Sequence, residues 1–191
     1  MIEKETETAR ALLASLSRRK TPSRALARVQ RYLGETEASM ATFRAAAERL
    51  RDRAEAREQG GGGFAVTGAL LLDAASCLLQ ARDSPAADSL LRRCATEFAA
   101  LSTHEQRRLP ILAAMAADRR LVEQVSWALP AESLGARLVS AWLRGSASEF
   151  RSCAVELRRA AAAPPIGPVD PWADSDIWEQ VWWAEAEAQR S

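Results

Sequence analysis

The sequence has little of the chemistry that most enzymes use. It holds one histidine, His104, and one tyrosine in 191 residues. Catalysis by His104 would need a cysteine or serine brought to it by the fold, and nothing near it in the sequence supports such a pair. No Cys-x-x-Cys, no His-Glu-x-x-His and no second histidine is present, so no metal site is predicted. We therefore expect no enzyme activity, no catalytic residue, no metal and no cofactor.

Long hydrophobic runs are also missing. Apolar stretches such as Ala69 to Leu72 are far shorter than the roughly 20 residues that a membrane helix needs. The first residues carry Glu3, Glu5 and Glu7, whereas a signal peptide begins with basic residues and an apolar run. We therefore expect no membrane partner and a cytoplasmic location.

Neither sign of charge is in excess, because 26 basic residues face 25 acidic ones and leave a net charge of +1. Such a chain has no overall field to attract nucleic acid. The charge is uneven, however. Between Thr8 and Gly34 there are seven basic residues and no acid, and Arg24, Arg28 and Arg31 follow a spacing that places them on one helix face. This face could bind phosphates, be merely solvated, or pair with the acidic C-terminal tail within the fold.

The three cysteines, Cys77, Cys94 and Cys153, are odd in number and widely spaced. Each lies within a helical pattern. This arrangement is typical of reduced thiols in a hydrophobic core and not of a disulfide framework.

What the sequence has in plenty is alanine and leucine, which favour helix over strand. We predict an all-α fold of antiparallel helical hairpins, packed as a tetratricopeptide-like array or as a bundle. Glycine and proline breaks divide it. The predicted parts are polar helices over 1–59, a glycine linker over 60–63, a helical-hairpin core over 64–162, a proline-rich linker over 163–171 and a tryptophan-rich helix over 172–191.

Helix signals are clearest in the predicted core. Phe64 to Leu101 is expected to form a hairpin whose second helix is capped by Ser84, followed by Pro85 at the first helical position. One face of that helix should bury Leu90, Leu91, Cys94 and Phe98. Further predicted start and stop signals are the Thr103 and Gln106 capping box, Pro110, the Asp118 cap, Gly145, and the Ser146 and Glu149 capping box.

The second helices of these hairpins begin near Pro85, Arg119 and Ala147, and repeats of similar length are typical of helix-turn-helix arrays. The segment from Trp142 to Leu157 resembles one tetratricopeptide repeat. That resemblance implies a concave surface that binds a peptide or protein.

The C-terminal segment concentrates tryptophan beside acidic residues. Trp183 lies about a hundred degrees around a helix from Trp182, so we expect Trp183 to be exposed. Exposed tryptophan beside acids is typical of an interface for a basic partner, whereas a structural cap over the helical array is the alternative. The predicted partner-binding residues are Trp172, Asp174, Asp176, Trp178 and Trp183.

The stretch from Leu109 to Leu157, with its alanine-rich helix, the turn over residues 118–122 and the Gly145 hairpin, resembles the all-helical immunity proteins of bacterial polymorphic toxin systems. The resemblance implies a protein that blocks a cognate toxin domain, often a basic nuclease.

Together these observations predict a non-enzymatic protein-binding module, with an immunity protein as its specific form. The alternative is a nucleic-acid-binding helical subunit that uses Arg24, Arg28 and Arg31. A second alternative is an enzyme with an unrecognised carboxylate site, for which Asp170, Asp174 and Asp176 are candidate magnesium ligands.

Overall fold

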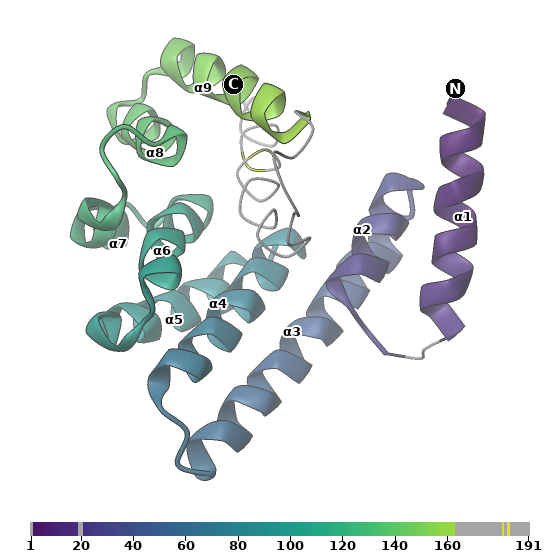
Figure 1. Ribbon diagram of the computed structural model, residues 1–191, viewed down its shortest axis with the longest axis horizontal. Helices are drawn as coiled ribbons and strands as arrows, with labels where there is room; N and C mark the ends of the chain where they lie inside the picture. The colour runs from purple at the N-terminus through teal and green to yellow at the C-terminus, as the bar shows by residue number, and fades with distance from the viewer. Residues whose placement is uncertain (1, 19–20, 163–180, 182, 184–191) are drawn as a thin grey trace. The chain divides into compact units, whose positions relative to one another are not determined.

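The computed structural model describes residues 2–18, 21–162, 181 and 183. Within this part of the chain the secondary structure is nine α-helices and two short 3-10 turns, without a strand, which confirms the predicted all-α class (Figure 1). The chain divides into two compact units, Met1–Leu101 and Ser102–Ser191. No helix among the described residues is both long and apolar enough to cross a membrane.

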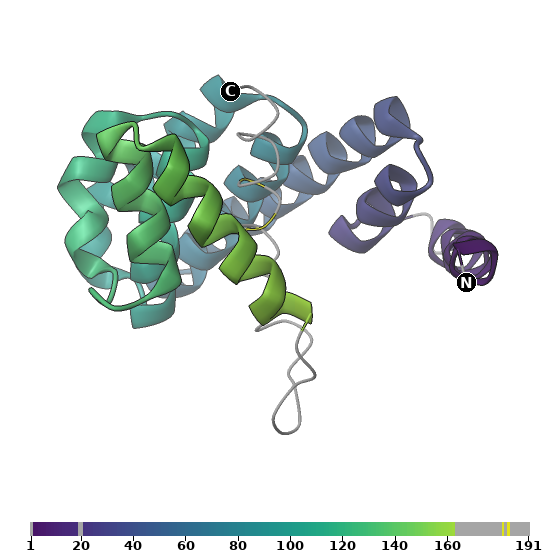
Figure 2. The same cartoon turned by 90° about the horizontal axis from the view of Figure 1, so that it is seen from above.

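The first unit contains five α-helices and one 3-10 turn. They are α1 (Ile2–Arg18), α2 (Arg24–Tyr32), α3 (Thr36–Gln59), α4 (Phe64–Gln80), α5 (Ser84–Thr96) and η1 (Phe98–Ala100). Helix α3 packs along α4 and also against α2, while α5 folds back on α4 and α1 packs on α2 (Figures 1 and 2). Phe43 of α3, Leu72 of α4 and Leu91 of α5 are fully buried in the resulting core.

The α4–α5 pair is the hairpin that the sequence predicts over Phe64 to Leu101. Leu91 and Cys94 are completely buried, as expected, but Leu90 and Phe98 are only half-buried. The helix cap differs from the prediction, since the Asp83 carboxylate, not Ser84, accepts a hydrogen bond from the Ala86 N–H at 3.3 Å. All three cysteines are buried and none of them is in a disulfide, which confirms the predicted core thiols.

The glycine run forms the turn between α3 and α4, inside the first unit. Gly61 has φ +74°, which glycine adopts without a Cβ penalty. The division into compact units therefore lies at Leu101 and not at this run, where the sequence suggested a linker.

The second unit contains α6 (Thr103–Met115), α7 (Arg119–Val125), η2 (Ser126–Ala128), α8 (Leu134–Arg144) and α9 (Ala147–Ala162). Helix α6 packs against α7, η2 and α8, and α9 folds back along α8 (Figures 1 and 2). The core is formed by fully buried side chains from three helices: Leu109, Leu112, Leu121, Val122, Leu138 and Val139.

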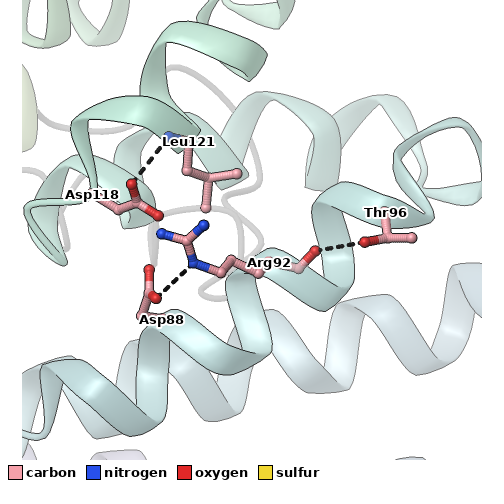
Figure 3. A network of polar contacts seen from close by, with 5 residues as sticks. All are labelled: Asp88, Arg92, Thr96, Asp118 and Leu121. Carbon is pink, nitrogen blue, oxygen red and sulfur yellow. Dashed lines mark hydrogen bonds and ion pairs between the residues drawn. The ribbon is translucent and has the colours of Figure 1, made fainter.

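The ends of these helices partly follow the predicted signals. Asp118 caps α7 by accepting the Leu121 N–H at 3.1 Å (Figure 3), and Gly145 ends α8 with φ +67°. Ser102, not Thr103, caps α6, and Pro110 lies within α6 without ending it. The region predicted as one core, 64–162, contains three successive hairpins, α4–α5, α6–α7 and α8–α9, but the boundary between the two compact units divides it after Leu101.

Candidate functional site

Trp127 is the most exposed large hydrophobic residue among those that the structure describes, with 73% of its surface accessible. Its position follows from its neighbours in the chain. Helix α7 ends at Val125, which is buried, and the chain then makes the η2 turn before Leu129 enters the core. With Val125 and Leu129 both directed inward, the residue midway between them faces outward.

Beside Trp127 the surface of the second unit is hollowed into a groove of about 780 Å³, which we call the α8 groove. The buried residues of its lining are Leu129 after η2, Val139 of α8 and Cys153 of α9, which with the half-buried Leu143 of α8 make its floor apolar. The complete lining consists of Ser126, Trp127, Leu129, Ala131, Ala136, Arg137, Val139, Ser140, Leu143, Arg144, Glu149, Ser152 and Cys153.

Ion pairs between α8 and α9 border the groove. Arg137 donates two hydrogen bonds to the Glu156 carboxylate, at 2.7 and 3.0 Å. Seven residues further along α8, about two helical turns, Arg144 pairs with Glu149 and also donates to the Ser140 hydroxyl at 2.7 Å. The hydrogen bonds between Arg137 and Glu156 lower the pKa of Glu156 and raise the pKa of Arg137. Because the pairs are exposed, they orient the side chains more than they stabilise the fold.

Cys153 is the only thiol in the lining of the groove. Burial raises the pKa of the Cys153 thiol, and the positive charge of Arg137 opposes that shift. A protonated thiol is a poor nucleophile, so the groove is not built around an activated cysteine. Over the described residues, no cluster of three or more histidine, cysteine or acidic side chains is arranged to hold a metal ion.

The arginine face predicted as a nucleic-acid site lies on α2 and makes contacts inside the first unit. Arg24 forms an ion pair with Asp73 of α4 at 2.9 Å. The Arg31 guanidinium lies 5.0 Å from the centre of the Phe43 ring and donates a hydrogen bond to the Gln80 carbonyl. Burial, followed by the nearby charges of Arg82 and Arg28, lowers the pKa of Arg31.

These contacts attach α2 to both α3 and α4, so Arg24 and Arg31 serve the packing of the first unit. Arg28 is half-buried on the same helix. Arg24 thus pairs with an acid within the fold, but that acid is Asp73 of α4, and the acidic residues of the C-terminal tail lie outside the described residues.

The expected exposure of Trp183 is wrong. Its side chain is only 3% exposed, with its ring edge-on to Trp142 of α8 at 6.2 Å and to Phe150 of α9 at 5.2 Å between ring centres. The two helices together offer an aromatic surface that the pattern of the C-terminal segment alone could not reveal. Val181 is likewise buried. The other predicted partner-binding residues lie outside the described residues: Trp172, Asp174, Asp176 and Trp178.

Sequence reasoning missed Trp127 and the two arginines of the α8 groove. A signal was present, since Trp127 falls between the core positions Val125 and Leu129 and is out of phase with both. Comparison of the chain with protein-family models, with curated proteins and with solved structures gives no match. The function of the groove must therefore be inferred from its own residues.

Proposed function

We propose that the protein is a non-enzymatic binding module that holds a polypeptide segment in the α8 groove. The observation that carries this proposal is an exposed tryptophan, Trp127, at the edge of a groove with an apolar floor. Tryptophan is among the residues that contribute most to protein–protein binding energy, and it does so where neighbouring groups exclude water. A groove lined by Leu129, Val139 and Leu143 beside it provides those neighbours.

The polar groups of the groove favour a polypeptide over a small molecule. Sites for small molecules aim a few polar groups at the ligand within a mostly enclosed apolar cavity. Here Arg137 and Arg144 are held by glutamates along the border, while the floor is apolar. An apolar centre within a charged border is the usual anatomy of a protein interface.

The same groups favour binding over catalysis. The Cys153 thiol has a raised pKa, and the Glu149 carboxylate is occupied by Arg144. Neither group is prepared to act as a nucleophile or as a general base.

Selection of peptides from a random displayed library on the full chain tests the proposal. The selected peptides should contain a large apolar residue and should lose binding to two variants, Trp127→Ala and Ser152→Phe. The first removes the anchor, and the second fills the groove from an exposed position of its lining. The matched control is Val155→Ala, which alters an exposed apolar residue of α9 outside the lining. Peptides that bind all three variants equally would contradict the proposal.

The immunity role implied by the sequence resemblance is a narrower form of the same proposal. It predicts that the chain protects cells from a toxin domain encoded beside its gene, and that Trp127→Ala abolishes the protection. Unchanged protection by the variant would place any immunity contact outside the α8 groove.

A further inference from the structure

The second unit carries on one surface both an exposed tryptophan, Trp127, and a groove that could accept such a side chain. Trp127 projects beside the α8 groove, and the groove, at about 780 Å³, has the volume of about 25 water molecules in the liquid. It can therefore receive a side chain as large as an indole. A surface that contains both halves of a contact meets the first requirement of a two-fold symmetric interface, in which the same patch serves both copies.

The charges along the groove are also self-complementary. Arg137 and Arg144 lie on α8, and their partners Glu156 and Glu149 lie on α9, so these two ion pairs hold two positive and two negative charges. A strongly acidic or basic partner would meet attraction and repulsion in equal measure. A two-fold related copy can instead lay its α8 edge against the α9 edge, with opposite charges facing each other. The chain's net charge of +1 adds no appreciable repulsion between copies.

We propose that the occupant of the α8 groove is a second copy of this chain, with each copy placing Trp127 in the groove of the other. This inference rests on the proposed binding function and names its partner. Each indole would bury an area on the order of 150–250 Å² that is otherwise largely in water. The border arginines and glutamates would fix the register of the two copies.

Sedimentation equilibrium of the full chain over about 1 to 100 µM tests the inference. We expect a reversible monomer–dimer equilibrium. Trp127→Ala should raise the dimer dissociation constant about 30-fold or more, as the loss of a hot-spot residue would. Ser152→Phe should do the same by blocking the groove, while the control Val155→Ala should change the constant less than about twofold. Thermal unfolding of each variant checks that it is folded.

Mixing the two disruptive variants gives a sharper test. In an equimolar mixture, Trp127 of the Ser152→Phe chain can still enter the open groove of the Trp127→Ala chain. One of the two symmetric contacts is then restored, so the mixture should associate more strongly than either variant alone.

Two results would contradict the proposal that a second copy occupies the groove. One is a wild-type chain that stays monomeric over the tested concentrations, and the other is a dimer that neither variant weakens. If the monomeric chain still binds selected peptides through Trp127, the proposed binding function stands and only this inference fails. If it binds no peptide either, both fail.

Discussion

The ring of Trp183 meets the ring of Phe150 edge-on, with 5.2 Å between their centres and 81° between their planes. Trp142 adds a second edge contact, so Trp183 packs against one aromatic ring from α8 and one from α9. Replacing Trp183 with alanine should lower the free energy of unfolding by about 3 to 5 kcal/mol, because a large buried ring would leave a cavity. Chemical denaturation measures this. An unchanged unfolding midpoint would show that Trp183 does not belong to the core.

The ion pair between Arg24 and Asp73 should contribute to stability, in contrast to the pairs on the surface. Its side chains are only 17% and 27% exposed. Arg24→Gln is therefore expected to lower the free energy of unfolding by about 1 to 3 kcal/mol, since it removes a charged hydrogen-bond donor from a carboxylate that is only 27% exposed. The control is Glu123→Gln in the exposed pair with Arg119, whose side chains are 56% and 64% exposed, and this change should cost about 0.5 kcal/mol or less.

The Arg24→Gln variant also distinguishes a packing role of the α2 arginines from a role in binding nucleic acid. If Arg24→Gln left the unfolding free energy unchanged and instead weakened binding to DNA in a salt-dependent way, the α2 face would be a phosphate-binding surface after all.

The Cys153 thiol should make stability depend on pH in the alkaline range. Its pKa is raised in the folded state, so folding favours the protonated thiol. The stability that depends on this proton is fully present below the ordinary pKa of about 9 and is lost as the pH rises through the raised value. The difference in unfolding free energy between wild type and Cys153→Ala should therefore be constant up to about pH 8 and then fall. A difference that grows above pH 9 would contradict the sign of the shift.

Gly145 should be required for its backbone conformation. It ends α8 with φ +67°, and no heavy atom lies within 4 Å of the position that a Cβ would occupy. Gly145→Ala should therefore lower the free energy of unfolding by about 1 to 2 kcal/mol, because alanine is strained in the left-handed conformation even though its Cβ meets no clash. Gly145→Asn should cost clearly less, because asparagine adopts this conformation more readily. Equal costs for the two variants would point to packing in place of backbone strain.

Local signals in the sequence predicted much of the helical framework. Asp118 and Gly145 mark helix ends through hydrogen bonding and backbone geometry, which depend on only a few neighbouring residues. Where two adjacent residues can each cap a helix, the sequence does not distinguish them. Asp83 and Ser84 are such a pair, and only the backbone shows that Asp83 stands at the cap.

The candidate site depends on which helices pair, and a single helical pattern does not contain that information. Trp183 was expected at the surface because its own segment could not bury every tryptophan, yet α8 and α9 supply rings that cover it. Trp127 differs, because its place between the core positions Val125 and Leu129 already indicates exposure, but the groove beside it forms only once η2, α8 and α9 are in place.

Calorimetric titration of the full chain, with a peptide selected for binding to the wild type, tests most directly whether the α8 groove binds a polypeptide. Trp127→Ala should weaken binding by about 2 kcal/mol, or about 30-fold, while leaving the unfolding midpoint nearly unchanged. Tyr32→Ala, which removes another exposed aromatic residue from the first unit, should bind as the wild type does. If Trp127→Ala instead bound the peptide with wild-type affinity, Trp127 and the α8 groove would not be the binding surface of this protein.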